Sequence, residues 1–214
     1  MKDLTPFAAQ FDASYPRYAD ERYTAISALV HRYGNVDLPT LLEDSKFKLF
    51  VDLLEPLIEI KNYKSQVPFP CDLPAALSCI YRIRTTSVSE NSLFEEHERL
   101  FKQLIEVQGF QLPTVSAVFH FCHPRHFPIV DRNVARACAL LKVNHSENFI
   151  DLPLPVLPKP HENKDAKLVR YRDFVAFLSK VVTLQRRYLP DADYRFVDKA
   201  LMVIGVQRLR EQVR

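Results

Sequence analysis

The sequence predicts an all-α fold, and three features carry this prediction. In several segments apolar residues recur at i, i+3, i+4 and i+7, which is the spacing of a buried helical face. No segment alternates apolar and polar residues in the way typical of a half-buried strand. The fifteen prolines cluster outside the periodic segments, and this separates the expected helices from their connections.

The composition is that of a folded protein. Of the 214 residues, 47% are hydrophobic, which suffices for one large domain or two small lobes. The formal charge of +3 suits a polyanionic partner, yet many proteins without one are equally basic. No apolar stretch approaches the roughly 20 residues that span a bilayer, and the N-terminus lacks a secretory signal. We therefore expect no membrane contact and a location in the cytoplasm, associated with the nucleoid, or in the nucleus.

Three helices are expected in the first part of the chain. The first ends at Gly34, which falls at the position of a left-handed C-terminal cap, and carries the stripe Ile26, Leu29, Val30 and Tyr33. The second covers residues 47–60 and is broken near Pro56. A proline-rich stretch at 67–70 precedes the third helix, at residues 75–83.

Five more helices follow. Ser92 and Glu95 form a capping box that opens a helix ending at Gly109, and a second helix follows the turn there. A third runs from Asp131 to about Leu141. The proline-rich residues 151–160 cannot be helical and are read as a connection between lobes. Beyond them, a long helix and a last one are marked by the apolar stripes Leu168, Tyr171, Val175, Leu178 and Val182, and Val197, Leu201 and Ile204.

The turn at Gly109 is predicted to grip a phosphate. A glycine-bearing turn leads into a helix with Pro113 in its first turn, where a missing N–H removes no hydrogen bond. Such a turn directs backbone N–H groups outward, with the positive end of the helix dipole behind them. Contacts of this kind hold DNA without reading its sequence. The predicted backbone-binding residues are Gly109, Phe110, Gln111, Leu112, Pro113 and Thr114.

An apolar run, residues 127–130, ends in the acid Asp131 at the start of a helix. One interpretation is that Asp131 is an N-cap, accepting a hydrogen bond from a backbone N–H near Asn133 or Val134. The other interpretation is that it is a functional acid, and the surrounding residues favour the latter.

Residues 126–136, His-Phe-Pro-Ile-Val-Asp-Arg-Asn-Val-Ala-Arg, resemble the catalytic-aspartate segment of adenine DNA glycosylases in the endonuclease III superfamily. Pro113 precedes Asp131 by 18 positions, the separation usual there between the variable lysine site of the hairpin and the aspartate. The resemblance covers about 35 residues, 107–141. It implies a helix-hairpin-helix motif at about residues 100–124 and two helical lobes flanking a DNA-binding cleft: 35–130, and 1–34 with 131–214.

The resemblance also implies the chemistry. Pro113 stands where members with lyase activity carry a lysine, so we expect hydrolysis of the N-glycosidic bond alone, with Asp131 as the catalytic carboxylate. The chain departs from the family pattern at Gln111, in place of a second glycine, and at Val115, in place of a small alanine. The upstream family segment that shapes the base pocket has no counterpart, so the base is not identified.

Several other residues are candidates for contacts. His123, His126, Arg132 and Arg136 are possible phosphate or site contacts, and Tyr81 and Arg82 could lie near a base pocket or act as a wedge. His120, Cys122, His123 and His126 crowd together but lack the spacing of a zinc motif, so no metal is expected. Only Cys138 follows Asp131, which does not suffice for an iron–sulfur cluster, and no cofactor is expected. The four cysteines are read as buried thiols.

The leading hypothesis is a monofunctional DNA glycosylase of base excision repair, acting as a monomer on double-stranded DNA with a flipped nucleotide. A second hypothesis is a non-catalytic DNA-binding protein that kept the hairpin and lost the base pocket. A third is an all-α protein in which the hairpin is only a joint between helices and the partner is a small molecule or a protein.

Overall fold

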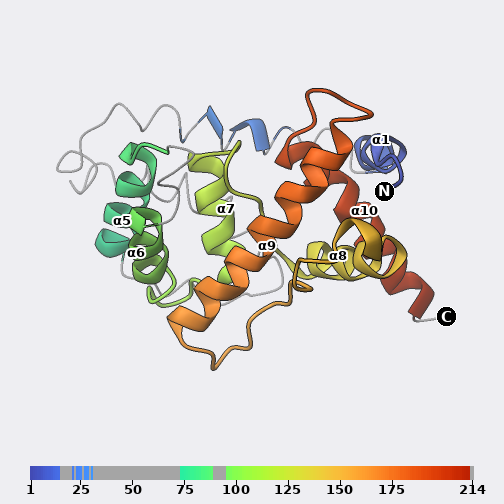
Figure 1. Ribbon diagram of the computed structural model, residues 1–214. Helices are drawn as coiled ribbons and strands as arrows, with labels where there is room; N and C mark the ends of the chain where they lie inside the picture. Colours follow the sequence, from blue (N-terminus) through green and yellow to red (C-terminus); the bar gives the residue numbers. More distant parts are fainter. Residues whose placement is uncertain are drawn as a thin grey trace. The chain divides into compact units, whose positions relative to one another are not determined.

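A computed structural model describes residues 1–14, 21, 23–25, 27, 28, 30, 73–88 and 95–212 (Figure 1). None of these residues lies in a β-strand, so the all-α prediction is confirmed for the described part of the chain. The elements are α1 (Thr5–Ser14), α5 (Leu73–Thr85), α6 (Glu95–Leu104), α7 (Leu112–Cys122), α8 (Arg132–Asn144), the short 3-10 helix η2 (Ser146–Asn148), α9 (Lys164–Gln185) and α10 (Tyr194–Gln212).

The chain divides into two compact units. Unit 1 consists of residues 1–18 and 124–214, and unit 2 of residues 19–123. The first unit therefore combines both ends of the chain. The boundaries differ from those expected from the sequence, which were placed at 34/35 and 130/131.

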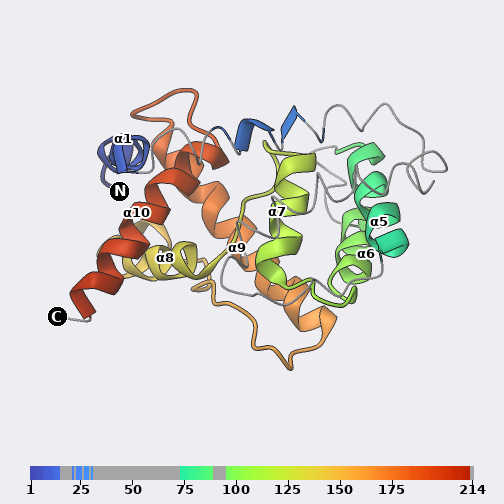
Figure 2. The ribbon, with the colours of Figure 1, turned by 180° about the vertical axis from the view of Figure 1, so that it is seen from behind.

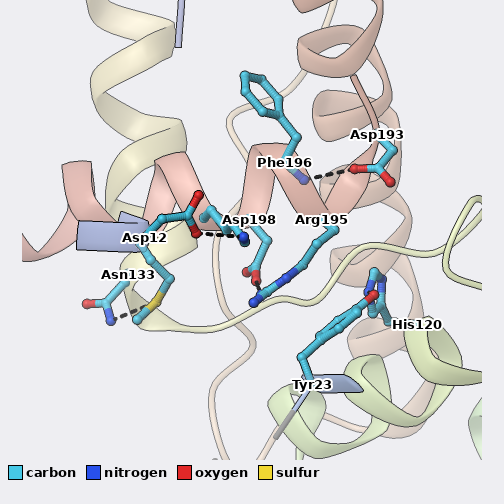
Figure 3. Close-up of polar contacts among 10 residues, drawn as sticks. Asp12, Tyr23, His120, Asn133, Asp193, Arg195, Phe196 and Asp198 are labelled. Atoms are coloured by element: carbon cyan, nitrogen blue, oxygen red, sulfur yellow. Dashed lines mark hydrogen bonds and ion pairs between the residues drawn. The ribbon is translucent and has the colours of Figure 1, made fainter. Parts of the chain in front are cut away.

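In unit 1, α1 packs along α10, as both views of the ribbon show (Figures 1 and 2). Phe11 of α1 lies beneath two cations of α10, 5.5 Å from the Arg195 guanidinium carbon and 5.8 Å from the Lys199 nitrogen. Lys199 also forms an ion pair with Asp12, at 2.7 Å (Figure 3). The N-terminal helix is thus held against α10 by two cation–π contacts and by a charge pair.

A buried glutamine at the end of α9 fixes the first residues of the chain. The Gln185 side-chain oxygen accepts a hydrogen bond from the Leu4 amide at 2.7 Å, and its nitrogen donates to the Lys2 carbonyl at 2.9 Å. Gln185 is fully buried, so both of its polar groups need partners inside the protein.

Helix α9 supplies many of the buried residues of unit 1. The predicted stripe of Leu168, Tyr171, Val175, Leu178 and Val182 is buried, as the periodicity indicated. Phe177, on the same helix, stacks on Phe149 at 4.3 Å between ring centroids. In the last helix Val197 and Leu201 are buried and Ile204 is half-buried.

The proline-rich residues 151–160 contain no helix, as predicted. They join α8 and η2 to α9, all of which belong to unit 1. The interpretation of this stretch as a connection between lobes was therefore wrong. Its prolines prevent helix formation, but they do not mark a boundary between the units.

Unit 2 contains α5, α6 and α7, and α7 is the most buried of the three. The sequence predicted one inward stripe on α7, formed by Val115, Val118, Phe119 and Cys122. Instead residues 114–121 are all buried, while Cys122 is half-buried. A helix that is covered on every side shows no amphipathic pattern, which is why periodicity understated its burial.

The remaining helix predictions agree with the structure where it can be compared. The helix expected at 75–83 is α5, and the one expected from Asp131 to Leu141 is α8. The helix expected to end at Gly109 ends at Leu104 and is followed by turns. Several other predictions lie outside the described residues. They concern the stripe residues Ile26, Leu29 and Tyr33, the cap Gly34, the helix at 47–60, the prolines at 67–70, and Ser92 of the capping box.

Candidate functional site

The turn between α6 and α7 depends on Gly109. The Phe110 amide donates to the Val107 carbonyl at 3.0 Å, which closes a four-residue turn. Gly109 is the third residue of this turn and has a φ of 89°, a left-handed conformation that glycine adopts without steric conflict. The position predicted from the sequence as a glycine-bearing turn therefore requires glycine for its backbone geometry.

Helix α7 begins without a side-chain cap. Its N-cap is Gln111, in an extended conformation, and the Gln111 side chain makes no capping hydrogen bond. Pro113 lies in the first turn, as predicted. The first N–H groups of a helix have no partner within the helix, and here the N-cap side chain supplies none. The start of α7 therefore has the chemistry that can accept an anion.

Among the six predicted backbone-binding residues, only Gln111 has an exposed side chain. Gly109 and Pro113 are half-buried. The side chains of Phe110, Leu112 and Thr114 are 1%, 2% and 3% exposed and belong to the core of unit 2. Any partner of this turn would therefore be bound through backbone groups and Gln111.

Asp131 is the N-cap of α8. One of its oxygens, Oδ1, accepts hydrogen bonds from the amides of Asn133 at 2.9 Å and Val134 at 3.0 Å. Its backbone is extended, and the residue is half-buried. The N-cap interpretation of Asp131 is therefore confirmed. Capping does not conflict with a chemical role, since a capping carboxylate is held rigidly and remains partly accessible.

The first turn of α8 is packed tightly against α10. A Cβ atom on Gly205 would lie 2.3 Å from the Asn133 carbonyl oxygen, so only glycine permits this approach of the two helices. The Asn133 side-chain nitrogen also lies 3.4 Å from the Met202 sulfur (Figure 3). The sequence showed Gly205 within an apolar stretch but gave no sign of this contact.

The segment that leads into Asp131 is embedded in unit 1. Residues 127–130 have no regular secondary structure, and all four are buried. The Tyr171 hydroxyl of α9 donates to the Pro128 carbonyl at 3.3 Å. The apolar run that the sequence placed before the acid is thus a buried stretch fixed by a helix 43 residues away.

The basic residues near Asp131 in the sequence differ in exposure. Arg132 is exposed, whereas His126 and Arg136 are half-buried. The Arg136 guanidinium donates to the Asn133 side-chain oxygen at 3.3 Å. Arg125, which sequence reasoning did not single out, is exposed in the turn that precedes the buried segment. All four belong to unit 1 together with Asp131.

The predicted contact His123 belongs to unit 2 and faces its interior. A ring nitrogen of His123 lies 2.6 Å from the Ile83 carbonyl of α5, and the ring meets that of His97 edge-on at 5.5 Å between centroids. His120 is fully buried, and its ring nitrogen lies 2.8 Å from the Tyr23 hydroxyl (Figure 3). Neither His97 nor Tyr23 was a sequence candidate, because each is far along the chain from its histidine partner.

Tyr81 and Arg82 lie in the last turns of α5, and both are half-buried. Arg84 accompanies them, so that the C-terminal end of this helix carries positive charge, the sign that the helix dipole favours there.

Among the described residues, no group of three or more histidine, cysteine, aspartate or glutamate side chains could hold a metal ion. Cys79 and Cys138 are buried free thiols, as predicted, and Cys122 is a half-buried free thiol. Burial raises the pKa of Cys122 to about 12 and also raises the pKa values of Cys79 and Cys138. Cys71 lies outside the described residues.

Across the part of the chain that the structure describes, no helix is both long enough and apolar enough to span a membrane. No protein-family model, curated protein or solved structure matches the chain.

Proposed function

We propose that this protein is a monofunctional DNA glycosylase, which hydrolyses the N-glycosidic bond of a damaged or modified base. The observation that carries the proposal is Asp131, at the start of α8 within the eleven residues that resemble the catalytic segment of adenine DNA glycosylases. The carboxylate is half-buried and fixed by two backbone amides. A catalytic acid needs this combination of accessibility and a defined position.

In this proposal Asp131 stabilises the sugar as it develops oxocarbenium character, and it orients or deprotonates the attacking water. The nucleotide must leave the base stack, because the glycosidic carbon is shielded inside duplex DNA. Pro113 has no amine that could form a Schiff base, so the product is an abasic site without strand cleavage.

The proposed grip on the DNA backbone uses α6, the Gly109 turn and α7 as a helix-hairpin-helix motif. Support comes from the left-handed Gly109 and from an α7 start whose N-cap side chain forms no hydrogen bond with it. Arg125 and Arg132 are exposed cations next to the Asp131 segment, and we propose that they contact phosphates. The two-lobed cleft remains an expectation from the resemblance.

The test uses duplexes that each carry one damaged or mispaired base, with alkali-labile sites as the readout. The native protein should release one class of base, and Asp131→Asn should release none. Asparagine caps a helix about as well as aspartate, so the variant should fold and bind DNA normally. The matched control is Asp193→Asn. Asp193 caps α10 through a hydrogen bond from the Phe196 amide at 2.8 Å and should tolerate the change (Figure 3).

A second function, a non-catalytic DNA-binding protein, is favoured by one observation. The two capping hydrogen bonds give Asp131 a structural role that explains its presence without chemistry. This alternative predicts affinity that falls steeply with salt, is the same for every lesion, and is accompanied by no base release. If Asp131→Asn releases base as well as the native protein, the catalytic assignment fails.

A further inference from the structure

A buried phenol, the side chain of Tyr171, forms a hydrogen bond with the segment before Asp131. Pro128 has no N–H, so its carbonyl is the only backbone group through which hydrogen bonds can fix it. That residue is buried, and the Tyr171 hydroxyl donates to its carbonyl at 3.3 Å. Because buried carbonyls without a donor are unfavourable, the position of Pro128 is coupled to that of α9.

Tyr171 remains a donor over the whole physiological pH range. Burial, and to a smaller extent the neighbouring Tyr194, raises the pKa of Tyr171 well above its usual value. The hydroxyl therefore stays protonated, and the Pro128 carbonyl keeps its hydrogen bond under all conditions in which the protein would act.

A second anchor lies on the other side of Asp131. Two residues after it, the Asn133 backbone rests against α10 at Gly205, in a contact too close for any side chain. Asp131 thus lies between a point fixed by α9, three residues earlier, and a point fixed by α10. Both contacts restrict the backbone on either side of the acid.

We propose that Tyr171 is a positioning residue for Asp131, setting through the Pro128 carbonyl where the carboxylate meets the reacting nucleotide. The proposal rests on the glycosylase function proposed above. A carboxylate that acts on a sugar and a water must be placed within about 0.5 Å, and a misplacement of about 1 Å can lower the rate roughly a hundredfold. Loss of the Tyr171 hydroxyl should therefore affect turnover more than substrate binding.

The test compares Tyr171→Phe with Tyr194→Phe in the full chain. Both changes remove one hydroxyl from a buried tyrosine of unit 1. The Tyr194 side chain, however, forms its hydrogen bond with Ser179, whereas that of Tyr171 forms one with the Asp131 segment. The measurements are kcat and KM on the responsive duplex, the melting temperature, and amide exchange at Asn133 and Val134. For Tyr171→Phe we expect kcat to fall about tenfold or more, KM to change less than about twofold, and exchange at both amides to accelerate. Tyr194→Phe should leave kcat and these two amides unchanged.

The outcomes separate this inference from the proposed function. If the native protein releases base and Tyr171→Phe keeps its kcat, the positioning role is wrong while the glycosylase function stands. If the native protein releases no base from any duplex, the glycosylase function fails. The exchange rates of the Asn133 and Val134 amides then test whether Tyr171 fixes the backbone around Asp131. Native exchange at Asn133 and Val134 in Tyr171→Phe would overturn the positioning role as well, whereas faster exchange would support its structural part alone, that Tyr171 fixes the backbone around Asp131.

Discussion

Helix α7 starts at Leu112 with no hydrogen bond from the side chain of its N-cap, whereas α8 starts at Arg132 beneath a carboxylate that accepts from two amides. The first start follows a left-handed glycine and carries a proline; the second follows a buried extended segment. A helix start without a side-chain cap can bind an external anion, and one capped by aspartate presents an acid in a fixed position. The two helix starts therefore offer different groups to a partner: amide groups at α7 and a fixed carboxylate at α8.

The largest effect on stability is expected from Gly205→Ala, which disrupts the close contact between α10 and the start of α8. The new Cβ would lie 2.3 Å from the Asn133 carbonyl oxygen, and backbone cannot yield as a side chain can. We expect a loss of roughly 2–3 kcal/mol in the free energy of unfolding, measured by urea denaturation. Gln207→Ala on the same helix, which loses a surface hydrogen bond to Gln10, should change it by less than about 0.5 kcal/mol. A stable Gly205→Ala would show that α10 does not hold the α8 start.

The corresponding change at the α7 start is Gly109→Ala. With φ at 89°, alanine would be strained, and we expect a loss of about 1–2 kcal/mol in the free energy of unfolding. Gly109→Asn is the control, since asparagine tolerates this conformation better and should be less destabilising. Equal stability of both variants and the native protein would mean that the turn relaxes into another conformation.

Comparison of Asp131→Ala with Asp131→Asn separates the contribution of the capping hydrogen bonds to stability from that of the negative charge. Alanine cannot accept from the Asn133 and Val134 amides, so thermal unfolding should report a loss of about 1 kcal/mol. Asparagine keeps the acceptor and should be close to the native protein. If asparagine destabilises as much as alanine, the negative charge contributes more than the hydrogen bonds at this helix start.

A smaller effect, an increase in stability, is expected when the N-cap of α7 is changed to a residue that can cap the helix, as Asp131 caps α8. Gln111→Ser adds a capping hydroxyl and should raise the free energy of unfolding by about 0.5–1 kcal/mol. Gln111→Asp should stabilise similarly but also place a negative charge where the proposal puts a phosphate. DNA affinity, measured by fluorescence anisotropy, should fall for Gln111→Asp and much less for Gln111→Ser. Unchanged affinity in both would indicate that this turn does not contact DNA.

The smallest effect is expected for the reactivity of the two thiols, Cys122 on α7 and Cys138 on α8. Because burial raises the pKa of Cys122 on α7 to about 12, above its ordinary value of 9.0, the thiol stays protonated at pH 8. Burial raises the pKa of Cys138 on α8 in the same direction. Iodoacetamide at pH 8 should leave both unmodified in the native protein and label both in urea, as read by mass spectrometry. The stability that the Cys122 thiol contributes is present below pH 9 and is lost as the pH rises toward 12.

Local patterns predicted much of the helical structure. Helices α9 and α10 follow the stripes read from the sequence, because each buries one face and exposes the other. The glycine turn and the Asp131 cap were also predictable, since both depend on residues within four positions of each other. The burial of α7 on all sides was not, because it depends on neighbours that no short pattern reveals.

The sequence by itself determined the all-α class, the acid that opens α8, and the absence of an amine at Pro113. Tertiary structure decided what holds that acid: the Tyr171 hydroxyl acts over a separation of 43 residues, and Gly205 permits contact with a helix far earlier in the chain. It also decided that His123 turns toward the Ile83 carbonyl, 40 residues away. Helix periodicity and capping are local interactions, whereas such contacts exist only once distant segments have packed together.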